Sequence, residues 1–129
     1  MPWSFRCFLS ARRRDVVDDW YRGLDDRAQA AFDTRMRFLK QQPITGWKRP
    51  HFDKFAGRYR GLGKVRFQSG NVQYRPIGFF SGGQEFTFVF PEATERGGRW
   101  APRNARDIAR DRMEIARNDR RRTHGCEFE

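Results

Sequence analysis

Three cationic side chains lie close together in the segment GLGKVRFQSGNVQYR, which runs from Gly61 to Arg75. Two runs of strand-forming residues, KVRF and VQYRPIGFF, flank a polar turn and predict a β-hairpin. Lys64 and Arg66 are two positions apart and point to the same face of a strand, as do Gln73 and Arg75. Such a surface could bind phosphate, because ammonium and guanidinium groups form charge-assisted hydrogen bonds with it. The alternative is a solvated sheet face whose long cations cover apolar neighbours.

Further cations and aromatic rings alternate in the segments on either side of this hairpin. Prolines and glycines interrupt residues 44–60 and 92–101, and both segments are therefore predicted to be loops. The candidate RNA-binding cations here are Lys54, Arg58, Arg60 and Arg99, and the rings near them are Trp47, Phe52, Phe55, Tyr59 and Trp100. Such a mixture can hold unpaired bases by stacking and the backbone by charge. The same rings could instead cap the core beneath long loops.

Other catalytic chemistry finds little support in the residue pattern. His51 and His124 are far apart, and no close group of cysteines and histidines suggests a metal site. A nucleophile elbow and a phosphate-binding glycine loop are both missing from the sequence. We therefore expect a protein that uses no metal and no cofactor.

The whole-chain composition indicates one basic domain. The 129 residues carry a formal net charge of +11, which favours nucleic acid, an anionic membrane surface or an acidic protein as partner. Cys7 and Cys126 predict no disulfide framework, and this favours a reducing cytoplasm. Neither a secretion signal nor a run of about 18 apolar residues occurs, so no contact with a membrane interior is expected.

The elements that position the hairpin follow from hydrophobic periodicity. Strands are predicted over residues 3–9, 64–67, 72–80 and 85–90, and helices over 15–21, 24–42 and from Pro102 onward. This order predicts an α+β fold, in which a small antiparallel sheet carries an N-terminal helical hairpin and a C-terminal helix on one face. Residues 1–119 form the expected domain, and residues 120–129 are expected to be a flexible tail without core contacts.

The order of elements and four motifs resemble the RelE/ParE toxin superfamily, and most of all its phage-derived HigB-type branch. The motifs are GLGKVRF, NVQYRPIGFF, QEFTFVFPEATER and APRNARDIARDRMEIAR, and the resemblance covers roughly residues 3–118. Such proteins are typically toxins of type II toxin-antitoxin systems that cleave mRNA on the ribosome. The resemblance therefore implies two partners, mRNA on the ribosome and a cognate antitoxin, often one with a helix-turn-helix domain.

The resemblance also implies roles for single residues. RNA cleavage in this family needs no metal, since the 2′-hydroxyl attacks the adjacent phosphate and clustered cations stabilise the charge that develops. Lys64 matches the candidate base, and Arg66, Arg75 and Arg96 match the phosphate-binding cations. Trp100 lies near the position of the tyrosine that assists proton transfer in RelE-type enzymes. Two alternatives remain: a non-catalytic phage or prophage RNA-binding protein, and a ParE-like gyrase inhibitor.

Overall fold

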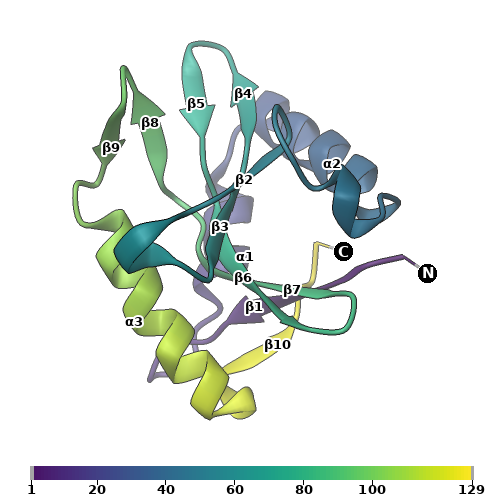
Figure 1. The fold of residues 1–129 in the computed structure, drawn as a ribbon. Helices are drawn as coiled ribbons and strands as arrows, with labels where there is room; N and C mark the ends of the chain where they lie inside the picture. Colours follow the sequence, from purple (N-terminus) through teal and green to yellow (C-terminus); the bar gives the residue numbers. More distant parts are fainter. Residues whose placement is uncertain (1, 129) are drawn as a thin grey trace.

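The computed structural model describes residues 2–128 and has an α+β fold with two β-sheets (Figure 1). One sheet has the order β10-β1-β7-β6-β3-β2, with strands β1 (Ser4–Phe8), β2 (Phe52–Lys54), β3 (Leu62–Val65), β6 (Ile77–Gly82), β7 (Glu85–Phe90) and β10 (Thr123–Gly125). The other has the order β4-β5-β8-β9, with strands β4 (Phe67–Ser69), β5 (Val72–Tyr74), β8 (Thr94–Arg96) and β9 (Arg99–Ala101). The predicted fold class is confirmed. The sheets are larger than expected, and they are not purely antiparallel, because β1 and β7 run parallel.

Three α-helices occur within residues 2–128, close to the predicted positions. They are α1 (Val16–Gly23), α2 (Asp26–Lys40) and α3 (Ala105–Asn118). Asp15 and Asp25 begin α1 and α2, because their carboxylates accept hydrogen bonds from first-turn N–H groups that have no partner inside the helix. None of these helices is long and apolar enough to cross a lipid bilayer.

Helices cover both faces of the six-stranded sheet. Adjacent strand residues point to opposite faces, and in β7 Phe88 and Val89 belong to different core clusters. The first cluster joins the sheet to α1 and α2 and includes Phe5, Cys7, Val17, Phe32, Met36, Leu39, Phe86 and Phe88. The second joins it to α3 and includes Leu62, Ile77, Phe79, Val89, Phe90, Ala105, Ala109 and Met113. The expectation that all helices share one face is therefore wrong.

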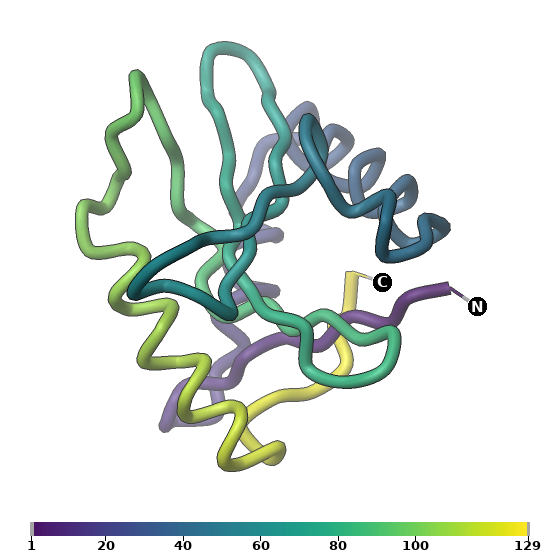
Figure 2. The backbone as a smooth tube through the Cα atoms, viewed as in Figure 1, coloured from purple at the N-terminus to yellow at the C-terminus, as the bar shows by residue number. Residues whose placement is uncertain are grey.

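The predicted hairpin exists, but each of its strands is broken in the middle. The chain leaves the six-stranded sheet after β3, turns at Arg66 and enters the four-stranded sheet as β4. It returns through Arg75 and Pro76 between β5 and β6. Pro76 has no N–H for a ladder hydrogen bond, which suits a position where pairing ends. The β4–β5 and β8–β9 hairpins consequently lie side by side, above the larger sheet in the view of Figure 2.

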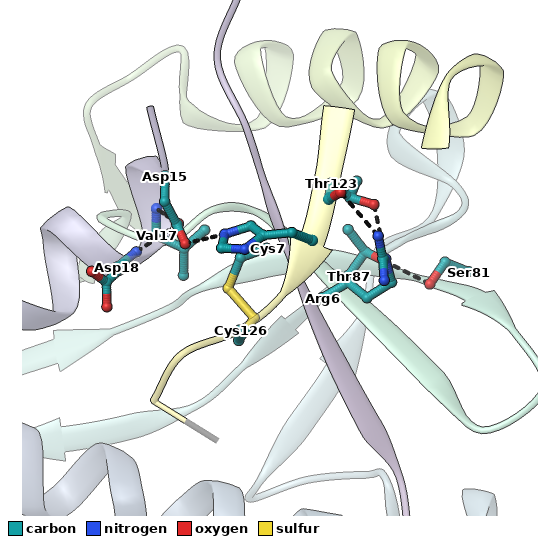
Figure 3. Close-up of a disulfide and its surroundings, with 10 residues drawn as sticks. Arg6, Cys7, Asp15, Val17, Asp18, Ser81, Thr87, Thr123 and Cys126 are labelled. Carbon is teal, nitrogen blue, oxygen red and sulfur yellow. Dashed lines mark hydrogen bonds and ion pairs between the residues drawn. A yellow bond between two sulfur atoms is a disulfide. The ribbon is translucent and has the colours of Figure 1, made fainter. Parts of the chain in front are cut away.

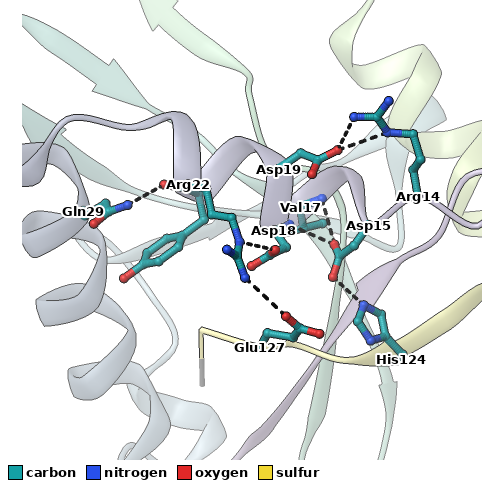
Figure 4. A network of polar contacts seen from close by, with 10 residues as sticks. Arg14, Asp15, Val17, Asp18, Asp19, Arg22, Gln29, His124 and Glu127 are labelled. Atoms are coloured by element: carbon teal, nitrogen blue, oxygen red, sulfur yellow. Dashed lines mark hydrogen bonds and ion pairs between the residues drawn. The ribbon is translucent and has the colours of Figure 1, made fainter.

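The C-terminal segment packs into the fold. Residues of β10 pair with β1, and Cys126 forms a disulfide with Cys7, their Cα atoms being 5.1 Å apart (Figure 3). His124 contacts the carboxylate of Asp15, whose other oxygen caps α1 (Figure 4). The expectation of a tail without core contacts is wrong for residues 120–128, since Cys126 belongs to the first core cluster and Phe128 packs against it. The two cysteines, from which no disulfide framework was expected, form one disulfide. Met1 and Glu129, the ends of the predicted ranges, lie outside the described residues.

Candidate phosphate-binding site

A basic cleft of about 340 Å³ lies on one face of the four-stranded sheet, where this sheet meets the larger one. We call it the arginine cleft, and its lining residues are Arg49, Arg66, Asn71, Gln73, Arg75, Glu95, Arg96, Gly97 and Gly98. Four of these residues are arginines and one is a glutamate, so the cleft attracts anions.

The strand register explains why these side chains meet. Gln73 of β5 lies directly opposite Glu95 of β8, so both project from the same face of the sheet. Arg75 follows Gln73 by two residues and lines the same cleft, as the sequence predicts. The backbone N–H of Arg75 donates to the carbonyl of Ala93 at 2.8 Å, and that of Arg66 donates to the carbonyl of His51 at 2.9 Å. The points where the chain changes sheets are therefore fixed by hydrogen bonds.

Arg75 is the most deeply held cation of the cleft. Its residue surface is only 4% exposed. Its guanidinium donates to Glu95 Oε1 at 3.0 Å, to Gln73 Oε1 at 2.5 Å and to the carbonyl of Tyr74 at 2.9 Å. Burial, together with the nearby Arg66, lowers the pKa of Arg75. An anion in the cleft would relieve this unfavourable charging and would find a guanidinium already oriented.

Lys64 lies behind Glu95 rather than in the cleft wall. Its Nζ is 3.6 Å from Glu95 Oε1 and sits 5.2 Å and 5.0 Å from the ring centres of Phe55 and Trp100. Burial lowers the pKa of Lys64, and the charge of Glu95 opposes this in part. Lys64 is not among the described residues that line the arginine cleft. Glu95 therefore links two nearly buried cations and presents its own carboxylate to the cleft.

The remaining cleft cations are more accessible. Arg49 pairs with Asp53 at 2.9 Å, and Arg96 is exposed at the end of β8. Arg66 is half-buried, and its Nε is shielded from solvent without a hydrogen-bond partner among residues 2–128. These groups are free to approach a ligand that enters from solvent.

The structure thus brings together the four predicted catalytic residues, three in the cleft wall and Lys64 behind it. The four predicted RNA-binding cations are more dispersed. Arg99 borders a neighbouring groove of about 600 Å³ together with Gly98, Trp100, Arg103 and Arg106. Arg58 pairs with Asp107 of α3 at 3.6 Å, and Lys54 and Arg60 are exposed on the segments around β2 and β3. Of the described residues, Lys54, Arg58 and Arg60 contribute nothing to the lining of the arginine cleft.

Glu95 is the main residue that the sequence analysis missed, because residues 92–101 were expected to be a loop. They contain the β8–β9 hairpin, with Gly97 and Gly98 at positive φ angles of 57° and 78°. Two consecutive residues of positive φ are typical of the tight turns that join twisted strands. The Gly-Gly pair was therefore the signal that could have predicted this hairpin and the inward direction of Glu95.

Comparison of the chain with protein-family models, with curated proteins and with solved structures finds no match. Within residues 2–128, no group of three or more histidine, cysteine or acidic side chains is arranged to hold a metal ion. The chemistry of the site has therefore to be inferred from its own side chains.

Proposed function

We propose that this protein binds RNA in the arginine cleft and cleaves it as a ribosome-dependent mRNA endonuclease, the toxin of a toxin-antitoxin pair. The observation that carries the proposal is the buried Arg75, held by Glu95 and Gln73 in a cleft with three further arginines. Such an arrangement is ready to bind charge that develops on a phosphate, often the largest contribution to catalysis. The order of elements, which resembles the RelE/ParE pattern, supports this function. In the same proposal, an antitoxin covers the cleft and the protein acts in the cytoplasm.

The reaction in this proposal uses the RNA's own 2′-hydroxyl. Its oxygen attacks the adjacent phosphorus, the bond from phosphorus to the 5′-oxygen breaks, and the products are a 2′,3′-cyclic phosphate and a 5′-hydroxyl. Arg66, Arg75 and Arg96 stabilise the charge on the phosphate oxygens.

Glu95 takes the proton of the 2′-hydroxyl, because it lines the cleft whereas Lys64 does not. In this assignment Lys64 is a positioning residue that holds the Glu95 carboxylate. The departing 5′-oxygen takes a proton from water, since Trp100 has no proton that it can transfer at neutral pH. The hydroxide that remains takes the proton from Glu95, which returns to the carboxylate form.

Primer extension on mRNA after induction of the protein tests this function. We expect the wild type to arrest growth and to cut translated messages. Glu95→Gln should reduce cleavage by about a hundredfold or more, the range for loss of a general base. Arg96→Gln, at an exposed position, should also reduce cleavage without affecting the fold. Arg117→Gln on the exposed face of α3 removes the same charge elsewhere and should cut like the wild type. Intact messages in cells that overproduce the wild type would contradict the proposal.

A second candidate function is an RNA-binding protein that does not cleave. The enclosure of Lys64 by Phe55, Trp100 and Glu95 favours it, because it keeps this amine from the ligand. It predicts that RNA binds with a strong dependence on salt but stays intact. DNA breaks without cut messages would instead indicate a gyrase inhibitor.

A further inference from the structure

A second basic pocket adjoins the arginine cleft on the side of α2. We call it the α2 pocket; it has a volume of about 210 Å³ and is lined by Arg35, Pro50, Arg66, Phe67, Gln68, Gln73 and Arg75. Arg66, Gln73 and Arg75 line both cavities. Arg35 was not singled out by the sequence analysis, because it lies in the middle of a helix far from the hairpin.

The charge in the α2 pocket is only partly compensated, since of its lining arginines Arg75 pairs with Glu95 of the arginine cleft. Three of its lining residues are arginines, and no aspartate or glutamate is among the described residues that line it. In the arginine cleft, by contrast, Glu95 is itself a lining residue. A pocket with guanidinium groups and no carboxylate favours an anionic ligand with several oxygens, such as phosphate.

Two hydrogen-bond donors in this pocket lack partners. The Nε atoms of Arg35 and Arg66 are both shielded from solvent, and neither has a hydrogen-bond partner among residues 2–128. A buried donor without a partner loses its hydrogen bonds to water and gains none in return, so each such group needs an explanation. A small rotation of the two side chains would turn these donors toward an anion in the pocket.

Arg35 is also held in place. Its guanidinium contacts Nδ1 of His51. The ring of His51 packs on that of Phe38, with centroids 4.2 Å apart. The guanidinium is therefore fixed between a helix and the loop before β2.

We infer that the α2 pocket is a second phosphate subsite, and that the two cavities hold consecutive phosphates of one single-stranded RNA. The order of the small sheet gives the path, since the arginine cleft lies over β8 and β5 and the α2 pocket over β5 and β4. Arg66 and Arg75, shared by both cavities, contact both phosphates. This inference rests on the RNA binding of the proposed function, but not on cleavage.

Fluorescence anisotropy with uncleavable 2′-O-methyl oligonucleotides tests this subsite. The probes are a dinucleotide with one phosphate and a trinucleotide with two. Arg35→Gln should weaken binding of the trinucleotide about tenfold, leave the dinucleotide unchanged and reduce the salt dependence by about one phosphate contact. Arg37→Gln, an exposed position on the same helix outside both cavities, removes the same charge and should bind both probes like the wild type.

A second variant tests the subsite without replacing Arg35, so the test does not depend on the folding of Arg35→Gln. Gln68 is exposed at the pocket, and Gln68→Glu should give the same selective loss by placing a carboxylate there. Equal trinucleotide affinities for Arg35→Gln, Gln68→Glu and Arg37→Gln would overturn the subsite, even if the wild type cleaves RNA. Binding of polyglutamate with the same Arg35 dependence would overturn its assignment to phosphate. If the two variants lose trinucleotide binding selectively but the wild type leaves RNA uncut, the subsite is supported and the proposed cleavage is contradicted.

Discussion

At the scale of single residues, the site depends on Glu95. Its carboxylate pairs with Arg75 at 3.0 Å and with Lys64 at 3.6 Å, and the side chains of these cations are only 5% and 10% exposed. Without Glu95, both cations would be nearly buried beside each other. The Glu95 carboxylate, which we propose as the base, therefore also stabilises Lys64 and Arg75 in their nearly buried positions.

Glu95→Gln should lower the free energy of unfolding by about 3 kcal/mol at neutral pH, the usual cost of removing one partner from a buried ion pair. The pKa of Lys64, already lowered by burial, should fall further because Glu95 no longer opposes the shift. A folded-state pKa below the unfolded-state value makes stability rise with pH between the two values. The deficit of the variant should therefore shrink as pH rises from neutral toward the ordinary lysine pKa of 10.5.

Urea unfolding of the wild type and Glu95→Gln at several pH values measures this deficit. Glu114→Gln, an exposed change on α3, is a matched control that should show no such trend. If the difference in unfolding free energy stays constant up to high pH, Glu95 does not influence the pKa of Lys64.

Residue types and spacing indicated that Lys64, Arg66 and Arg75 lie close together, since alternation along a strand is a local property, and the structure brings them together. Glu95 and Arg35 could not be found this way. Arg35 reaches the site only because distant segments pack, and such contacts leave no local pattern in the sequence. For Glu95 the local signal was the Gly97-Gly98 turn, which indicates the hairpin but not its pairing with β5.

At the scale of elements, the β8–β9 hairpin sets the outer wall of the cleft. Its two-residue turn places Arg96 opposite Arg99 in the register. A Cβ at Gly98 would meet no atom within 4 Å, so only its backbone angle restricts substitution.

Gly98→Ala should destabilise the protein by about 1 kcal/mol, because a residue with a Cβ is strained at a positive φ angle. Gly98→Asn should cost less, since asparagine tolerates this conformation. Gly23→Ala in α1 is the control, since it is equally unobstructed but needs no positive φ, and it should leave stability unchanged or raise it. Thermal unfolding of the three variants measures their relative stabilities. Equal destabilisation by Gly98→Ala and Gly23→Ala would refute the role of the positive φ.

The helices could be predicted to within a few residues, because apolar stripes and capping aspartates are local signals. The breaks at Arg66 and Arg75 could not. A strand that changes sheets keeps its residue alternation, and only the identity of its partners changes. Phe90 is a second example. Alternation along β7 places it on the same face as Phe86 and Phe88, but it belongs to the other core cluster, because a register shift interrupts the pairing of β6 with β7 next to it.

At the scale of the whole molecule, the disulfide joins Cys7 to Cys126, which are 119 positions apart in the sequence, and so closes a loop of most of the chain. It ties β1 to the segment that follows β10. Disulfides persist mainly in oxidising compartments, so after reduction in a cytoplasm only packing and the hydrogen bonds with β1 would hold the C-terminal segment.

Replacing both cysteines by alanine should lower the unfolding free energy by about 2–5 kcal/mol, the range for disulfides that close long loops. The wild type in dithiothreitol should unfold at the same denaturant concentration as this double variant, and the oxidised wild type at a higher one. Coincident transitions with and without reductant would show that the cross-link contributes nothing.

The pairing of β1 with both β7 and β10 has a consequence for synthesis. β1 can complete its hydrogen bonds only after β7 and β10, which both lie far later in the sequence, have been synthesised. Such non-local pairing also slows folding. A newly made chain therefore acquires its finished six-stranded sheet only after β10 has left the ribosome.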